Sequence, residues 1–91
     1  MNRTIEHNSD HHRFEYVEDS MSSVLDYQLD DGIMTITHTE VPSALGGRGI
    51  AADLTRAALD VARREGWRVR PACSYAQTYI RRHTDYQDLL A

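Results

Sequence analysis

The chain has 91 residues, 41% of them apolar, and a net charge of −4, which predicts one small domain with a modest core. The negative charge and the lack of a long basic stripe disfavour a nucleic-acid partner. No apolar run approaches the length of a membrane span and residues 1–13 lack a signal-peptide pattern, so we expect no membrane association and a cytoplasmic location. The single cysteine, Cys73, excludes an internal disulfide framework and a cysteine-rich zinc site.

Charge is distributed unevenly along the chain. Residues 1–40 hold nine acidic and two basic side chains, whereas residues 41–91 hold five acidic and eight basic ones. All ten basic residues are arginine, whose planar guanidinium donates two hydrogen bonds at once to a phosphate. A phosphate-bearing ligand is therefore expected to bind the second part of the chain.

The N-terminal residues are polar and carry several histidines. Residues 1–12 are predicted to form a flexible arm, and residues 13–91 a single domain. Within the arm, His7, His11 and His12 are similar to a metal-binding tract, but no carboxylate or cysteine spacing completes a site. We therefore expect no metal.

Three strands are predicted next. Apolar and polar residues alternate over residues 13–17 and 24–29, and residues 33–41 are rich in β-forming types. The sequence Asp-Asp-Gly at residues 30–32 favours a tight hairpin turn between the second and third strands. Pro42 ends the third strand.

A glycine-rich turn with the sequence GGRG follows at residues 46–49, and an amphipathic helix follows the turn. The apolar stripe of this helix starts at Ile50, and Gly66 supplies the stop signal. Glycine lets the backbone approach a ligand, while the first helical turn presents unpaired N–H groups and a partial positive charge. The segment therefore indicates a diphosphate site with the amides of residues 47–50 as donors and Arg48 as an added charge. The alternative is a simple connection in which glycine only permits tight packing.

The last elements are a short strand over residues 67–70, ended by Pro71, and a helix over residues 74–83. The resulting order, βββαβα, predicts an α+β fold of the α/β sandwich type. Strands one to three are antiparallel, and a right-handed crossover through the first helix makes strands three and four a parallel pair.

These motifs together resemble the GNAT acetyltransferase superfamily, in its short, single-domain N-acetyltransferase-like branch. In that superfamily a Gln/Arg-x-x-Gly-x-Gly/Ala loop grips the diphosphate of coenzyme A. Here Gly49 and Ala51 match the loop, while Gly46 replaces the usual Gln or Arg. The resemblance covers about residues 14–90 and rests on HTEVP at 38–42, GGRGIA at 46–51, PACSY at 71–75 and YIRRH at 79–83.

The resemblance implies an enzyme that binds acetyl-CoA and transfers the acetyl group to an unidentified amine, either a small molecule or a protein. A non-catalytic acyl-CoA-binding or regulatory module is the alternative, because so short a chain can hold the coenzyme and lack an acceptor pocket. Full-size members of the superfamily have extra elements on both flanks that help to shape the acceptor site, and this sequence lacks them. A homodimer, in which a partner chain forms one wall of the site, therefore stays an alternative. The implied coenzyme-binding residues are Val41, Gly46, Gly47, Arg48, Gly49, Ile50, Ala51 and Tyr79.

Three residues are catalytic candidates under this resemblance. His38 and Glu40 share one face of the third strand, where either can take the amine's proton through water or can simply be an exposed strand residue. Cys73 follows the fourth strand, close to the expected position of the coenzyme sulfur. It is an acetyl relay, a proton donor to the leaving thiolate, or a small buried side chain. The tyrosine of the superfamily's second-helix motif falls on Ile80, and Tyr79 lies one residue early.

The segment Gly-x-Gly-x-x-Ala at residues 47–52 also satisfies the dinucleotide-binding fingerprint. That fold needs an acidic residue about 20 positions later to bind a ribose hydroxyl. Residues 70–72 are Arg, Pro and Ala, so nicotinamide binding is disfavoured.

Overall fold

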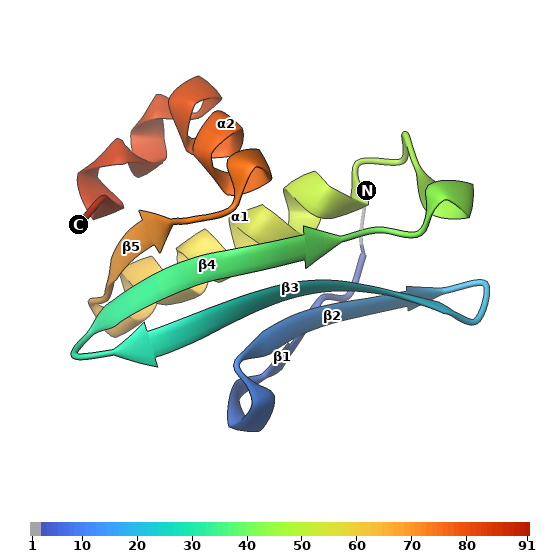
Figure 1. Cartoon of the computed structure of the whole chain (residues 1–91), viewed down its shortest axis with the longest axis horizontal. Coiled ribbons are helices and arrows are strands. Elements are labelled where there is room, and N and C mark those ends of the chain that lie inside the picture. The colour runs from blue at the N-terminus through green and yellow to red at the C-terminus, as the bar shows by residue number, and fades with distance from the viewer. Residues whose placement is uncertain (1–2) are drawn as a thin grey trace.

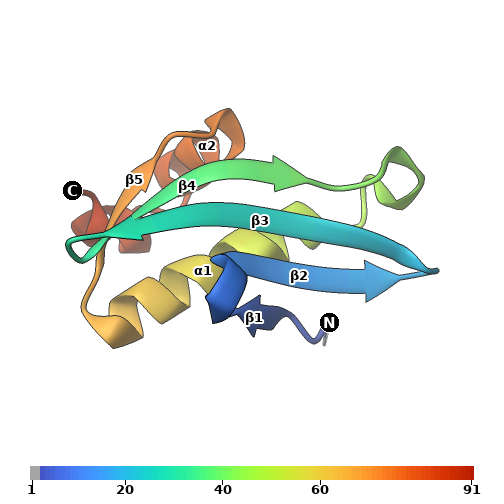
Figure 2. The same cartoon turned by 60° about the horizontal axis from the view of Figure 1, so that its bottom comes forward.

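The computed structural model describes residues 3–91. It contains one five-stranded sheet in the order β1-β2-β3-β4-β5, with both α-helices on one side of the sheet (Figures 1 and 2). None of the helices in residues 3–91 is long and apolar enough to cross a membrane. The strands are β1 (Glu6–Asn8), β2 (Arg13–Glu18), β3 (Met21–Asp30), β4 (Ile33–Glu40) and β5 (Arg68–Pro71).

The helices are α1 (Ile50–Glu65) and α2 (Ser74–Arg82), with 3-10 turns η1 (Ser9–His11), η2 (Ser43–Leu45) and η3 (Thr84–Leu89). Neighbouring strands from β1 to β4 are antiparallel, and β4 pairs with β5 in parallel. The predicted α+β fold and its one parallel pair are therefore confirmed. A two-residue turn at Asp31 and Gly32, with φ of 55° and 76°, joins β3 to β4 as the sequence predicts.

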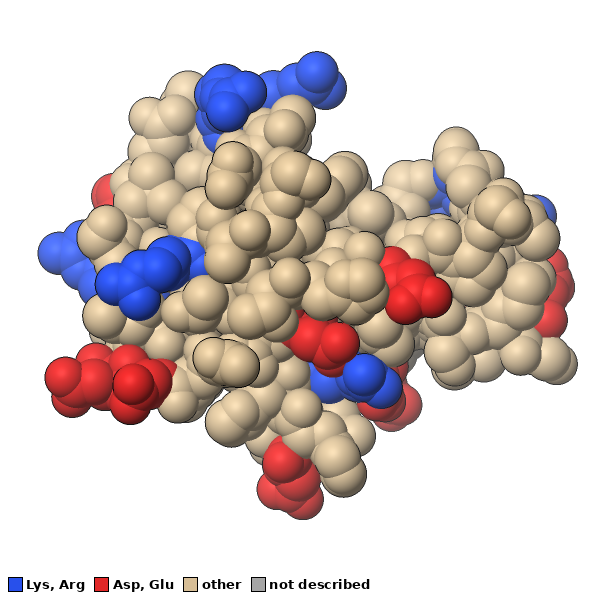
Figure 3. Space-filling model, viewed as in Figure 1, with Lys and Arg blue, Asp and Glu red and all other residues tan. Residues whose placement is uncertain are grey.

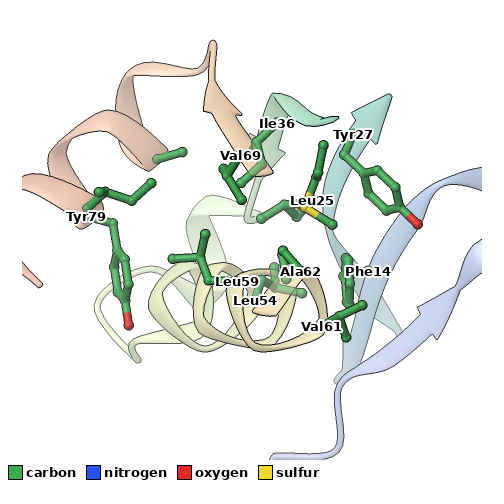
Figure 4. Close-up of a cluster of buried hydrophobic side chains, with 14 of the residues drawn as sticks. Phe14, Leu25, Tyr27, Ile36, Leu54, Leu59, Val61, Ala62, Val69 and Tyr79 are labelled. Atoms are coloured by element: carbon green, nitrogen blue, oxygen red, sulfur yellow. The ribbon is translucent and has the colours of Figure 1, made fainter. Parts of the chain in front are cut away.

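The core lies between α1 and the covered face of the sheet. The buried stripe of α1 includes Ile50, Leu54 and Leu59, which are at most 1% exposed. These side chains pack among residues from β2, β3 and β5, as Figure 4 shows, and α2 closes one end of the cluster with Tyr79. Replacing Leu54 by alanine would cost about 2–5 kcal/mol, as for other buried leucines, so α1 is held firmly by packing.

The first strand differs from the sequence prediction. Residues 3–12 belong to the segment expected to be a flexible arm, yet residues 6–8 form β1 and pair with β2. Residues 1–2 of that expected arm lie outside the described residues. Three residues give too short a pattern for a strand prediction, and side-chain contacts made far along the chain hold this strand in place.

His7 provides the main contacts of β1. Its ring stacks on Phe14 with 4.2 Å between centroids, and its Nε2 lies 2.7 Å from the Tyr27 hydroxyl. Burial lowers the pKa of His7, and the positive charge of Arg64 acts in the same direction. The folded state therefore favours the neutral imidazole.

We expect the chain to lose stability as the pH falls below about 6.5, the ordinary pKa of histidine. Because the pKa of His7 is lower in the folded state, the unfolded state takes up the proton first. The stability present above this pH is lost as the pH falls through the folded pKa. Urea unfolding above and below this pH measures the loss. His7→Gln should diminish it, whereas His11→Gln, at an exposed histidine beside Asn8, should not. The same pH dependence in His7→Gln and the unaltered chain would contradict the assignment.

Strand β4 contains a bulge that determines which side chains face the helices. Tyr27 is paired with Ile36 and Asp26 with His38, so Thr37 is an extra residue on β4. Residues directly opposite in a sheet share a face. After the bulge, Thr39 is paired with the buried Leu25 and lies on the covered face. The alternation of β4 is therefore reversed beyond Thr37.

Candidate active site

The glycine turn between β4 and α1 presents a row of backbone donors. Gly47 and Gly49 have φ of 80° and 81°, values that favour glycine. The Gly46 amide donates to the Ser43 carbonyl at 3.0 Å. The next amide along the chain with a backbone acceptor is that of Asp53 in α1, which donates to the Gly49 carbonyl at 3.1 Å. Between them, among the described residues, the amides of residues 47–52 donate to no protein acceptor. The turn thus combines close backbone approach with the positive end of a helix.

Arg48 extends from this turn toward the β2–β3 hairpin. Its guanidinium pairs with Glu18 and lies 3.7 Å from the Asp19 carboxylate. A hydrogen bond from Tyr16, assisted by Arg48, lowers the pKa of Glu18. The side chain remains partly exposed, so an incoming anion would compete with these carboxylates for it.

The turn is held from the other side by Arg3. Its Nη1 donates to Asp53 at 2.5 Å and its Nη2 donates to the Arg48 carbonyl. The guanidinium also lies 5.7 Å from the Tyr16 ring centroid. The hydrogen bond to Asp53 raises the pKa of Arg3. A basic residue that precedes β1 thus contacts the start of α1.

A cavity of about 110 Å³ lies between α1 and α2, with Ala52 from the first turn of α1 in its lining. In the view of Figure 3 the surface is notched between the part formed by α2 and the lobe formed by the β4–α1 loop with the β2–β3 hairpin below it, and basic side chains lie over α2. A larger cavity of about 290 Å³ lies on the opposite side of α2 and includes no residue of the turn. The smaller cavity is lined by Ala52, Tyr75, Thr78, Tyr79, Arg82 and His83.

Tyr79 is largely buried in the wall of this cavity. It is 7% exposed and stacks on His83 with 4.0 Å between ring centroids. Burial raises the pKa of Tyr79 and also that of Tyr75. Both phenols therefore keep their protons at neutral pH, and each can donate or accept a hydrogen bond without carrying a negative charge.

The predicted coenzyme-binding residues divide into backbone and side-chain contributors. The Ile50 side chain is 1% exposed, so only its main chain is open to a ligand. Val41 is partly buried against the core. Gly46 already uses its amide within the turn. Four of the predicted residues have an amide without an acceptor among the described residues and a side chain that is either accessible or absent. They are Gly47, Arg48, Gly49 and Ala51.

The catalytic candidates are separated by the sheet. His38 and Glu40 lie together on the uncovered face, with Nε2 and Oε1 3.2 Å apart. Cys73 lies on the helix side, where its Sγ is 3.6 Å from the Thr39 hydroxyl. Among the described residues no hydrogen bond joins Cys73 to His38 or Glu40. A proton passed between the two groups would therefore need water or substrate in between.

Strands β4 and β5 part next to Cys73. Their pairing ends at Ile36 and Pro71, and the amides of Ala72 and Cys73 both donate to the Ile36 carbonyl, at 2.9 and 3.0 Å. The last four residues of β4 have no partner in β5. This opening joins Cys73 to the edge of β4 that leads into the glycine turn.

Comparisons with known proteins agree with this arrangement. A family model described as GCN5-related N-acetyl-transferase matches residues 13–89. The chain belongs to the GCN5-related N-acetyltransferase family. Membership confirms the resemblance predicted from the sequence motifs.

Individual family relatives are similar over different lengths. The chain is 45% identical over 49 residues to Protein NATD1 of Gallus gallus and of Homo sapiens, which is 54% of this chain and 44% and 43% of those proteins. The match thus spans less than half of each curated relative. A GCN5-like protein from Staphylococcus aureus, solved by NMR, has a TM-score of 0.77 at 26% identity and covers 99% of this chain and 89% of its own.

Two residues of the site are missed by the sequence reasoning. Thr39 faces Cys73 only because the bulge at Thr37 reverses the alternation of β4, and a period of two does not reveal a bulge. Arg3 reaches Asp53 across 50 positions of sequence, and no local pattern signals such a contact. Both follow from tertiary structure alone.

Proposed function

We propose that this member of the family binds acetyl-CoA with its diphosphate over the amides of residues 47–51 and transfers the acetyl group to an amine. The observation that carries the proposal is the row of amides without protein acceptors at the start of α1. These donors fit the oxygen-rich, negatively charged diphosphate. The cavity between α1 and α2 is lined by Ala52, whose amide belongs to that row. The pairing of β4 with β5 ends beside Cys73. Both features support a path for the rest of the coenzyme.

Two routes for the transfer fit the geometry. In the first, the Cys73 thiol loses its proton to water, its sulfur attacks the thioester carbonyl, and the coenzyme A thiolate leaves and takes up a proton. The amine then attacks the new Cys73 thioester, the Cys73 sulfur leaves, and the amine's proton passes to water. In the second, the amine attacks the thioester directly while His38 or Glu40 takes its proton through water. The 3.6 Å contact with Thr39 and the position on the helix side favour the first route, because His38 and Glu40 face away.

The test is titration calorimetry with coenzyme A, followed by mass spectrometry of acetyl-CoA incubated with the chain and a panel of amines and peptides. We expect saturable binding and an acetylated amine. Binding without any acetylated product would favour the non-catalytic acyl-CoA-binding module. No detectable binding would overturn the proposal.

Coenzyme A affinity should fall as salt rises, because the screening length shortens from about 10 Å at 0.1 M to about 3 Å at 1 M salt. Arg48→Gln should weaken binding and flatten this dependence. Arg13→Gln removes the same charge from an ion pair with Asp26 on the uncovered face, and serves as the matched control. A dissociation constant that stays constant from low to high ionic strength would contradict the electrostatic contribution.

A further inference from the structure

Arg3 lies outside the segment that matches the family model, which begins at residue 13, yet it contacts the glycine turn directly. Residues 3–5, which precede β1, lie beside the start of α1 (Figure 1), where Arg3 contacts Asp53. The Arg3 side chain is 7% exposed, and its Nε has no hydrogen-bond partner among residues 3–91. A guanidinium this buried does not reach a ligand in solvent. Its effect on a ligand must pass through the groups that it holds.

One of those groups is the peptide bond between Arg48 and Gly49. Arg3 Nη2 donates to the Arg48 carbonyl. In a trans peptide the carbonyl and the following N–H point in opposite directions. Holding the Arg48 oxygen toward Arg3 therefore points the Gly49 amide away from Arg3, toward the open side of the turn.

The second group is Asp53, in the first turn of α1. Arg3 Nη1 donates to one carboxylate oxygen at 2.5 Å, while Arg56 donates to the other at 2.9 Å. Asp53 is thereby neutralised on the side facing the turn. Without Arg3, this carboxylate would keep only the exposed Arg56 as a partner, and its less compensated charge at the helix start would repel an incoming anion.

We propose that Arg3 is a positioning residue for the diphosphate-binding turn, which makes the segment before β1 a part of the coenzyme site. It orients the Gly49 amide and neutralises Asp53 without touching the coenzyme. The inference rests on the proposed function for its ligand, but the orientation of the turn is a property of the ligand-free chain. A guanidinium is needed because its two terminal nitrogens donate at once to two acceptors, the Asp53 carboxylate and the Arg48 carbonyl.

Three variants test the proposal. Arg3→Gln removes the charge and the fork, Arg3→Lys keeps the charge and loses the fork, and Arg13→Gln is a control that breaks a different ion pair, with Asp26 at 2.6 Å. In the ligand-free chain, hydrogen exchange of the Asp53 amide, which donates to the Gly49 carbonyl, should accelerate in both Arg3 variants and not in the control, because loosening the turn opens this bond. Unchanged exchange in Arg3→Gln would overturn the proposal.

Measurements of ligand affinity then distinguish two explanations for an effect of Arg3, a specific role in the turn and a general loss of structure. Arg3→Gln should weaken coenzyme A by about tenfold, as expected for disturbed charge-assisted hydrogen bonds, and should leave the affinity for S-acetylpantetheine, which lacks the diphosphate, unchanged. Equal loss for both ligands, or no loss for coenzyme A, would contradict the inference. If the unaltered chain binds neither ligand, the proposed function fails, and the exchange experiment still decides the role of Arg3.

Discussion

Gly49→Val should weaken coenzyme A binding by at least tenfold in a chain that remains folded. At φ of 81°, a side-chain-bearing residue costs about 1–2 kcal/mol, so the backbone will rotate and turn its amide away. Losing one charge-assisted hydrogen bond costs about 1.5–3 kcal/mol. A Cβ at Gly49 would lie 3.9 Å from Arg3 Nη1, an ordinary contact. Backbone conformation, rather than a side chain in the phosphate position, is therefore the expected cause.

Gly32→Val is the matched control for this experiment. Gly32 has φ of 76° and no atom within 4 Å of a built Cβ, but it lies in the β3–β4 hairpin. The two variants carry the same kind of strain, and only one alters the turn. Thermal unfolding should show similar destabilisation, while calorimetry should show lost affinity for Gly49→Val alone. Unchanged affinity in a folded Gly49→Val variant would refute the diphosphate site.

Cys73→Ala should abolish the formation of an acetyl-enzyme and lower turnover by about 100-fold or more, as expected when a group acting on the reacting atoms is removed. The unaltered chain should gain about 42 Da after incubation with acetyl-CoA, the mass of an acetyl group replacing a thiol proton. Cys73 is the single cysteine of the chain, so a thioester adduct has one possible location. Cys73→Ser tests whether a hydroxyl can replace the thiol.

The opposite result assigns the direct route. If no adduct forms and Cys73→Ala keeps most of its turnover, His38→Gln and Glu40→Gln should reveal the base. Alkylation of Cys73 provides a separate measure of its position, because saturating coenzyme A should slow the reaction. Alkylation that coenzyme A does not slow would leave Cys73 as a packing residue only.

Much of the fold can be predicted because its signals are local. The apolar stripe from Ile50 and the stop at Gly66 define α1, and Gly66 does adopt φ of 77° with its amide bonded to the Ala62 and Arg63 carbonyls. The hairpin at residues 31–32 follows from turn chemistry. Strand β1 cannot be predicted in this way, because three residues carry no periodicity and their stability comes from stacking of His7 on Phe14.

The candidate site is only partly predictable from sequence. The glycine turn is identified by its composition, and its unpaired amides follow from helix geometry. The direction of a side chain cannot be predicted from local sequence in the same way. Arg48, for example, pairs with the carboxylates of Glu18 and Asp19, which are far away in sequence. The relation of His38 and Glu40 to Cys73 depends on the register of β4, and register is a property of the whole sheet.

The bulge at Thr37 means that the register of β4 selects the chemistry at its end. If Thr37 paired with Asp26 and the bulge were lost, β4 would slip by one residue beyond Ile36. His38 and Glu40 would then move to the helix side, beside Cys73, while Thr39 would turn to the uncovered face. Such a slip would exchange a hydroxyl for an imidazole and a carboxylate next to the sulfur, with no substitution anywhere. Family members in which β4 pairs with β3 without this bulge are expected to differ in the groups available for proton transfer.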